Sequence, residues 1–174
     1  MEHTPEPRIG DVFGCILQRC WAVGAEAGRH VLALHGRGED VVGMDSSPGS
    51  VEVACQRGAE VRLGVVARPR GAGAFDSFLL LGNNLGLLQG ERAVPRVLEQ
   101  LAALARPGAL LVGTGMDPDS SDPEHTAYHD HNRARGRQPG QVRMWVRSGT
   151  LATDWFDYLL AGVGDLERLV HPSP

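Results

Sequence analysis

The sequence has little cysteine and no long hydrophobic run. Its three cysteines, Cys15, Cys20 and Cys55, form no C-x-x-C pair, which excludes a zinc site of that spacing and a dithiol redox motif. We interpret them as small buried or idle thiols. No apolar stretch approaches the roughly 18 residues of a membrane-spanning helix. The start, residues 1–11, lacks the apolar core of a signal peptide, so we expect a cytoplasmic protein that contacts no membrane.

The chain also lacks an excess of positive charge. Its formal net charge is −4, its pI is near 5.9, and aromatic residues make up 5% of it. Nucleic acids are bound mainly by clustered basic side chains, so this balance argues against nucleic acid as the main partner. With 174 residues, of which 42% are hydrophobic, the chain is long enough to fold around a core as one domain.

Run lengths, apolar periodicity and breakers predict alternating strands and helices between residues 20 and 115. We expect strands at the end of 12–23 and over 39–45, 59–66, 77–83 and 109–115, with helices over 28–38, 46–58 and 91–108. The helix over 46–58 has a serine cap and a proline in its first turn. The helix over 91–108 carries an apolar stripe, and the residues "RPG" are expected to end it. This alternation predicts a parallel sheet with helices on both faces, which binds ligands at the carboxyl ends of its strands.

The pattern changes after residue 115. Residues 116–140 form a long polar segment rich in charge. Residues 141–149 and 154–162 are expected to form two antiparallel strands, and the last residues at most a short helix.

The stretch "AVGAEAGRH", residues 22–30, follows the first strand and carries Gly24 and Gly28. Asp45 ends the next strand, 17 residues after Gly28. The glycines let the backbone approach a ligand closely, a helix N-terminus favours an anion, and an acid in the place of Asp45 can accept hydrogen bonds from ribose hydroxyls. These residues indicate a nucleotide or nucleoside cofactor. The alternative is a plain α/β sheet in which Asp45 is merely solvated.

At this point the sequence resembles a known family. The segment 22–58, "AVGAEAGRHVLALHGRGEDVVGMDSSPGSVEVACQRG", looks like the front half of a class I S-adenosylmethionine-dependent methyltransferase. "FDSFLLLGNNLGLL" resembles the family's fourth strand and following loop, and "LEQLAALARPGALLVGTGMDP" resembles its helix and fifth strand. The segment from 128 to 160 is similar to a substrate-side insertion of bacterial members. The resemblance covers roughly residues 20–162, and its most specific parts are the contexts of Asp45 and of Arg106.

The resemblance implies a Rossmann-like three-layer αβα sandwich with a mainly parallel sheet and C-terminal antiparallel strands. It implies a single domain over 1–174, with a short N-terminal region at 1–20 and a substrate-side insertion at 116–162. The implied cofactor is S-adenosyl-L-methionine, and the implied reaction is methyl transfer to a small-molecule acceptor. Positioning of the two reactants carries most of such catalysis, and some members add a general base.

The resemblance also assigns residues to the site, although it identifies no catalytic residue and no metal ligand. The residues expected at the cofactor are Val23, Gly24, Glu26, Gly28, Asp45, Ser46, Leu63, Val65 and Asn83. In these assignments the glycine loop wraps the methionine end, Asp45 holds the ribose, and Asn83 lies beside the reactive methyl. The residues expected at the acceptor are Asn84, Tyr128, His129, Asn132 and Arg133.

Three positions depart from the family pattern. Ala22 stands where an acid usually faces the amino group of the cofactor, and Val65 stands where an acid often binds the adenine. Glu26 replaces the second glycine of the loop. Because Glu26 has a Cβ, the left-handed backbone expected at this position costs about 1–2 kcal/mol. Its carboxylate is expected to lie near that of the cofactor, where the two negative charges repel each other. The alternative is that Glu26 points to water and pairs with Arg29.

These departures keep a second function open. In that alternative the chain is a binding or interaction module that retained the fold but is impaired in catalysis. Nicotinamide binding is a weaker alternative, because the loop lacks the order G-x-G-x-x-G. The family's closing strands have no clear counterpart after residue 162, so we expect an exposed sheet edge that a second copy covers in a homodimer.

Other features have both a structural and a functional interpretation. His125 and His129 have the spacing of one helix face, but without an H-E-x-x-H signature we expect no metal; a histidine here could instead act as a general base. The segment "NRARGR", 132–137, is either a solvated face or a clamp for an anionic substrate. Trp145, Trp155, Phe156 and Tyr158 are expected to pack in the core, with an acceptor pocket as the alternative. Asn83 and Asn84 could also form a simple turn.

Overall fold

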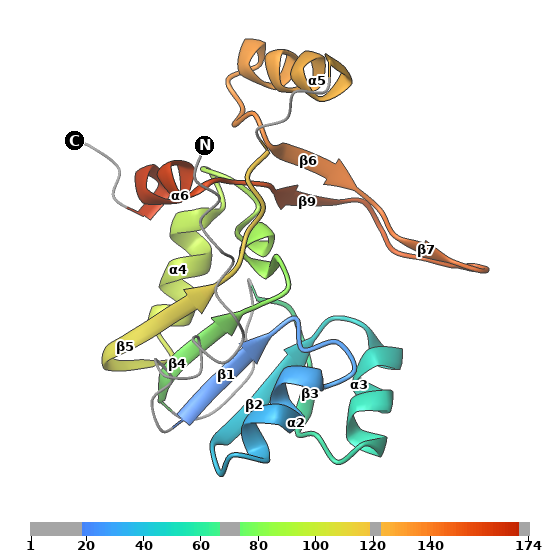
Figure 1. Ribbon diagram of the computed structural model, residues 1–174, viewed down its shortest axis with the longest axis vertical. Helices are drawn as coiled ribbons and strands as arrows, with labels where there is room; N and C mark the ends of the chain where they lie inside the picture. The colour runs from blue at the N-terminus through green and yellow to red at the C-terminus, as the bar shows by residue number, and fades with distance from the viewer. Residues whose placement is uncertain (1–18, 67–73, 119–122, 171–174) are drawn as a thin grey trace, which may run out of the picture. The chain divides into compact units, whose positions relative to one another are not determined.

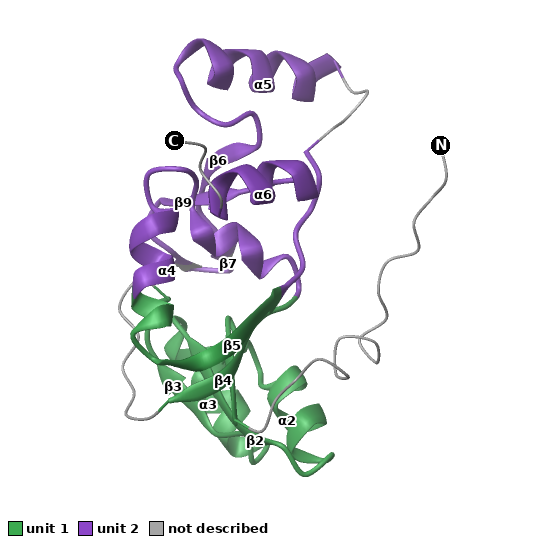
Figure 2. Ribbon diagram, turned by 90° about the vertical axis from the view of Figure 1, so that its left-hand side faces the viewer, with its two compact units in different colours: residues 1–81, 100–112 green, residues 82–99, 113–174 purple. Residues whose placement is uncertain are grey.

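The computed structural model describes residues 19–66, 74–118 and 123–170 (Figure 1). The chain forms two compact units (Figure 2). The first contains residues 1–81 and 100–112, and the second contains residues 82–99 and 113–174.

The first unit is built on a five-stranded sheet in the order β3-β2-β1-β4-β5. The strands are β1 (Arg19–Val23), β2 (Asp40–Asp45), β3 (Val61–Leu63), β4 (Phe75–Leu80) and β5 (Ala105–Gly113). β1 pairs in parallel with β2 and with β4, and β2 pairs in parallel with β3. The arrow of β5 points the same way as that of β4 in Figure 1. The order reverses beside β1, and in open α/β sheets such a reversal places the ligand crevice beyond the strand ends.

Helices α2 (Arg29–His35) and α3 (Pro48–Gln56) join β1 to β2 and β2 to β3. They pack on one face of the sheet through a core that includes Val31, Leu34 and Ala54, all fully buried. The sheet residues beneath them are small. A Cβ on Gly43 would lie 2.8 Å from that of Ala25, so a larger residue would push the helix layer away.

Aromatic side chains fill another part of the first unit. The rings of Trp21 and Phe75 are edge-to-face with centroids 4.6 Å apart, and Phe78 packs against Phe75 at 6.1 Å. The predicted elements up to residue 83 are confirmed in type. The part of 12–23 before Arg19 lies outside the described residues.

The predicted boundary between the helix over 91–108 and the strand over 109–115 is wrong. Helix α4 is shorter, Val94–Ala102, and β5 already begins at Ala105. Arg106 pairs with Asp76 of β4 at 2.9 Å, which draws "RPG" alongside that strand. Pro107 is tolerated there because β5 lies at the edge of the sheet and no partner needs its missing N–H. Leu110 and Leu111 of this edge strand are exposed, and pairing with a second copy stays a prediction.

The second unit contains the short 3₁₀ helix η1 (Asn84–Leu88), α5 (Pro123–Ala134) and α6 (Val163–Val170). β6 (Gln141–Met144) pairs antiparallel with β9 (Phe156–Leu159), which confirms the predicted strand pair. A smaller hairpin of β7 (Arg147–Ser148) and β8 (Leu151–Ala152) extends between them. None of the helices in the described ranges is both long and apolar enough to cross a membrane.

Candidate functional site

The loop that joins β1 to α2 has an unusual backbone. Gly24, Glu26 and Gly28 all have positive φ, at 67°, 50° and 79°. Position 28 requires a glycine for two reasons: its φ is left-handed, and a Cβ there would lie 2.7 Å from the Cβ of Ala59. The loop is held to β2 by the amide of Ala25, which donates to the carbonyl of Met44 at 2.9 Å.

Asp45, the last residue of β2, organises this edge of the sheet. One carboxylate oxygen accepts from the amide of Glu26 at 2.8 Å, and the other accepts from the amide of Ser47 at 2.8 Å. The backbone carbonyl of Asp45 accepts from the amide of Gly64 at 2.9 Å. Asp45 thus ties the glycine loop, the start of α3 and the end of β3 together. Each carboxylate oxygen has two lone pairs, so each can still accept a further hydrogen bond from a ligand.

Helix α3 begins beside this carboxylate, as its sequence predicts. Ser47 caps the helix, its side chain accepting from the amide of Ser50 at 3.3 Å, and Pro48 takes a first-turn position where no N–H is needed. Ser46 and Ser47, which directly follow the end of β2, are exposed.

Two aliphatic side chains at the end of β3 face outward. Leu63 is 54% exposed and Val65 is 47% exposed. Exposed apolar groups next to a polar, strand-end carboxylate can cover a flat apolar ring, as small-molecule sites combine apolar walls with a few polar anchors.

The two interpretations of Glu26 are each confirmed in part. Its backbone is left-handed at φ 50°, as expected of a residue in a glycine position. Its side chain is exposed, as the alternative expects. The expected ion pair with Arg29 is not among those formed by the described residues. Ala22 is 4% exposed and is part of the core beneath α2 and α3, so an acid there would be a buried charge.

We expect Glu26→Gly to strengthen binding of a ligand that carries a carboxylate at this loop. The substitution removes a negative charge that would oppose the carboxylate of the ligand, which is the reason for the tighter binding. It also removes the left-handed strain, about 1–2 kcal/mol, which acts on the stability of the fold. The entropy of the added glycine offsets part of the stability gain, so unfolding free energy is expected to change by less than about 1 kcal/mol. Calorimetric titration of both proteins measures the effect. Ala27→Gly adds a glycine to the same loop without changing charge and is the control; an equal gain in both variants would contradict this account.

His30 is a buried residue near the loop that the sequence does not single out. It lies in the first turn of α2 and is 9% exposed. Burial is the main cause that lowers the pKa of His30. The positive charge of Arg29 lowers it further, and the negative charge of Glu26 opposes the shift. The neutral imidazole is therefore the form that the fold favours.

This shift predicts how stability depends on pH. In the unfolded chain a histidine titrates near pH 6.5, whereas folded His30 takes up its proton at lower pH. Between these two pKa values the unfolded state binds more protons, so stability is lost as pH falls below about 6.5. Denaturant unfolding at pH 7.5 and 5.5 should show a smaller loss in His30→Gln than in the wild type. His35→Gln, at the exposed end of the same helix, should behave like the wild type.

Asn83 and Asn84 belong to the second unit. Asn83 has a left-handed φ of 65°, and its amide donates to the hydroxyl of Thr114 at 3.0 Å. The hydroxyl of Tyr158, on β9, donates to the carbonyl of Asn83, and burial raises the pKa of that phenol. The loop is therefore fixed from two sides, which is more than a simple turn requires. Tyr158, which the sequence pattern predicts in the core, is half-buried and supports this loop instead.

The expected acceptor residues of α5 differ in exposure. Tyr128 is 41% exposed and Asn132 is 1% exposed. The side-chain amide of Asn132 donates to the backbone carbonyls of Pro139 and Gln141, each at 2.8 Å, so this side chain supports the turn after α5. Arg133 pairs with Asp130 at 2.7 Å on the surface, and His129 is half-buried. Their contact with an acceptor stays a prediction.

The remaining sequence features are placed as follows. Within the described ranges, no group of three or more His, Cys, Asp or Glu side chains could hold a metal. Trp145 and Trp155 are 42% and 59% exposed and stack edge-to-face at 6.1 Å, so their predicted core packing is wrong. Cys20 is buried, which raises the pKa of its thiol to about 12, and Cys55 is exposed. Cys15 lies outside the described residues.

The sequence and the fold were compared with those of known proteins. No protein-family model matches the sequence, and no curated protein is significantly similar to it. Among solved structures, the chain is similar to a SAM-dependent methyltransferase from Bacteroides fragilis in complex with S-adenosyl-L-homocysteine. The TM-score is 0.72 at 28% identity, over 91% of this chain and 64% of that one. The chain therefore spans less than two thirds of the length of that relative.

Two further similarities agree with this result. A SAM-dependent methyltransferase from Methanosarcina mazei matches with a TM-score of 0.70 at 16% identity, over 91% of this chain and 81% of that one. The sugar N-methyltransferase KedS8 from Streptoalloteichus matches with a TM-score of 0.58 at 17% identity, over 87% of this chain and 69% of that one. The protein has the fold of the class I S-adenosylmethionine-dependent methyltransferases, which confirms the predicted fold class.

Proposed function

We propose that this protein binds S-adenosyl-L-methionine and transfers its methyl group to a small-molecule acceptor. The observation that carries the proposal is the position of Asp45. Its carboxylate lies at the carboxyl end of β2, is fixed by the amides of Glu26 and Ser47, and keeps lone pairs for two ribose hydroxyls.

The other residues of this edge fit the parts of the same cofactor. Val23 ends β1, and Gly24 and Gly28 belong to the loop that follows, where the methionine end would lie; positive φ at both glycines brings the backbone close to a ligand. Ser46, Leu63 and Val65 would flank the adenine, the two aliphatic side chains being exposed. Asn83, in a loop of the second unit that Thr114 and Tyr158 hold, is assigned to the cofactor by the family resemblance alone, and this assignment stays a prediction.

The reaction needs little chemistry from the protein. The bound cofactor supplies a sulfonium methyl group, which passes to a nucleophilic oxygen or nitrogen while that atom loses a proton to solvent or to a base. The chain's own residues bind and orient the two reactants. The similarity to a sugar N-methyltransferase supports a small acceptor.

Ligand-induced thermal stabilisation tests the proposal. S-Adenosylhomocysteine at 100 times its Kd should add about 2.7 kcal/mol to stability, which corresponds to about 5–10 °C in Tm for a chain of this size. NAD⁺ at the same concentration should leave Tm unchanged. Stabilisation by NAD⁺ alone, or by neither compound, would contradict the proposal.

The left-handed Glu26 favours a second candidate, a module that kept the fold with an impaired cofactor loop. The two candidates differ in one result. If only Glu26→Gly binds S-adenosylhomocysteine, the wild-type chain is the impaired module.

A further inference from the structure

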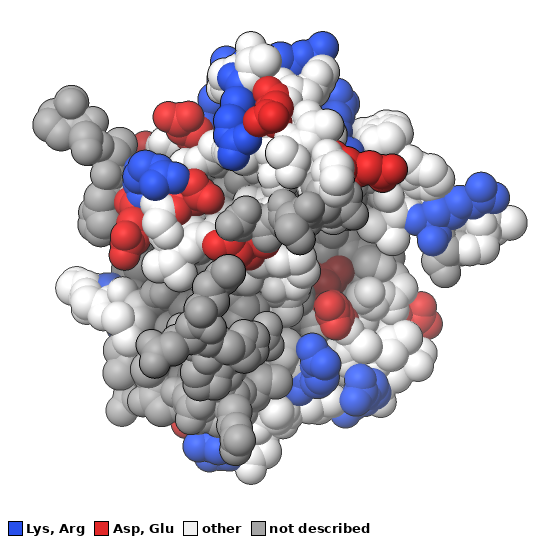
Figure 3. All heavy atoms as spheres, turned by 45° about the horizontal axis from the view of Figure 1, so that its top comes forward, with Lys and Arg blue, Asp and Glu red and all other residues white. Residues whose placement is uncertain are grey.

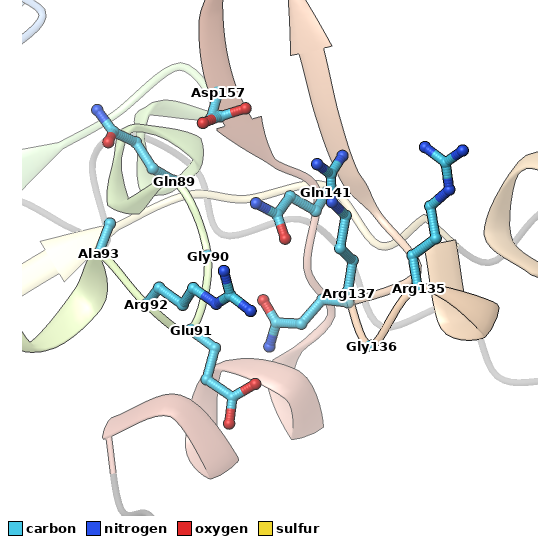
Figure 4. A pocket seen from close by; sticks show the side chains of 11 residues that line it. Gln89, Gly90, Glu91, Arg92, Ala93, Arg135, Gly136, Arg137, Gln141 and Asp157 are labelled. Atoms are coloured by element: carbon cyan, nitrogen blue, oxygen red, sulfur yellow. The ribbon is translucent and has the colours of Figure 1, made fainter. Parts of the chain in front are cut away.

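A polar pocket of about 440 Å³ lies within the second unit (Figure 4). Its volume falls in the range of about 300–1,000 Å³ that is common for small-molecule sites. It is formed by two segments that are far apart in the sequence, residues 89–93 before α4 and residues 135–141 after α5, together with Asp157 of β9.

The first wall has a constrained backbone. Gln89 has a left-handed φ of 67°, although it is not a glycine, and Gly90 follows with φ 115°. A Cβ on Gly90 would lie 3.1 Å from the side chain of Gln141, across the pocket. The backbone therefore passes closely beside the opposite wall. Strain of this kind persists where the surrounding structure holds it, and it is frequent at ligand sites.

The second wall is a turn fixed from inside. The carbonyl of Asn132 accepts from the amides of Arg135 and Arg137, at 3.0 and 2.9 Å. Its side-chain amide holds the carbonyls of Pro139 and Gln141, and the hydroxyl of Tyr128 also donates to Gln141, at 3.4 Å. These contacts hold Arg137 and Gln141 in place before any ligand arrives, which lowers the entropy cost of binding.

Three arginines line this pocket: Arg92, Arg135 and Arg137. Their guanidinium groups form no ion pair or hydrogen bond with any residue that the structure describes, whereas Arg133 and Arg168 are paired with aspartates. In Figure 4 the side chain of Arg92 points toward Gln141, and Arg137 lies on the far side of Gln141. Basic and acidic groups are interspersed on the face shown in Figure 3.

The carboxylates of the lining do not neutralise these arginines. Glu91 and Asp157 are both exposed, and Figure 4 shows Glu91 directed away from Gln141 and Asp157 near Gln89. The Oε1 atom of Gln138 is buried and accepts no hydrogen bond from the described residues. A ligand that donates a hydroxyl or amine proton would satisfy it.

We propose that this pocket binds the oxyanion group, phosphate or carboxylate, of a small polar molecule. Unpaired guanidiniums bind such groups through two parallel hydrogen bonds, and the three glutamines of the lining suit hydroxyl or amine groups on the rest of the ligand. The lining holds no aromatic side chain, so it offers no stacking surface for a base or other flat ring. That this molecule is the methyl acceptor rests on the proposed function.

Amide NMR spectra of the full chain, titrated at low salt with inorganic phosphate and separately with malonate, test the inference. At least one probe should shift the amides of Gly90 and Gly136 saturably, and the tighter probe identifies the oxyanion. Arg92→Gln and Arg137→Gln should each weaken that binding about tenfold, because each change removes charge-assisted hydrogen bonds to the oxyanion. Arg96→Gln makes the same charge change on the exposed face of α4, outside the pocket, and should leave the affinity unchanged.

Two results would overturn the inference: no saturable shift with either probe, or an equal loss in Arg96→Gln. The spectra also report whether each variant is folded. Because S-adenosylhomocysteine is expected on the first unit, its binding is measured separately. Oxyanion binding without S-adenosylhomocysteine binding would contradict the proposed function and leave the pocket assignment intact, and the reverse result would do the opposite.

Discussion

Asp45→Ala is expected to weaken binding of S-adenosylhomocysteine by roughly 150-fold or more. The substitution removes both acceptors proposed for the ribose hydroxyls, and hydrogen bonds to a charged group contribute about 1.5–3 kcal/mol each. It also leaves the amides of Glu26 and Ser47 without their partner, so the glycine loop loses an anchor. Calorimetric titration of the variant and the wild type measures the ratio of dissociation constants.

Two further variants separate binding from folding. Asp45→Asn keeps one oxygen acceptor, so its loss of affinity should be smaller than that of Asp45→Ala. Asp40→Asn changes the acid at the opposite end of the same strand, where Asp40 pairs with Arg19 at 3.3 Å, and should leave affinity unchanged. An Asp45→Ala protein that is folded and binds like the wild type would show that Asp45 is not in the site.

The second large effect is expected from Gly86→Ala. A Cβ at this buried position would lie 2.1 Å from the ring of Tyr158, so the ring must leave its place. The ring would then lose its hydrogen bond to the carbonyl of Asn83. Overpacking of this kind costs about 1–3 kcal/mol, and the lost hydrogen bond adds to it. Denaturant unfolding should show a lower midpoint.

A double-mutant cycle identifies the cause. In a Tyr158→Ala background the same Gly86→Ala change should cost little, because the ring that it meets is gone. Gly164→Ala lies in α6 of the same unit, where the nearest atom to the new Cβ is an arginine nitrogen 3.8 Å away, and should not lower stability. If Gly86→Ala costs the same in both backgrounds, the close contact with Tyr158 is not the reason.

The sequence predicts the first unit well because its signals are local. The serine and proline before α3 determine where that helix begins, and the β-branched run before Asp45 determines a buried strand. Asp45 is the last residue of that run, and the alternation of strands and helices predicts that the strand is parallel. Its position at the carboxyl end of the sheet therefore follows from the sequence. The left-handed backbone of Glu26 follows in the same way from its place between two glycines.

Other features depend on contacts between distant residues, and local patterns do not contain them. Arg106 enters β5 because Asp76 lies beside it, although "RPG" has the composition of a stop signal. Trp145 and Trp155 alternate with polar residues as core residues do, yet they stack on each other at the surface. The contact of Tyr158 with Gly86 and the pocket formed by Arg92 and Arg137 join segments more than 40 residues apart. Burial of His30 likewise depends on what packs around α2.

Calorimetric titration of the wild-type chain with S-adenosylhomocysteine measures whether the edge around Asp45 binds the cofactor. We expect saturable binding of one molecule per chain with a dissociation constant in the micromolar range, which corresponds to about −8 kcal/mol. Binding should weaken in Asp45→Ala and tighten in Glu26→Gly. A folded wild-type chain that releases no heat and shows no change in Tm with this ligand would contradict the assignment of the edge around Asp45 as a cofactor site.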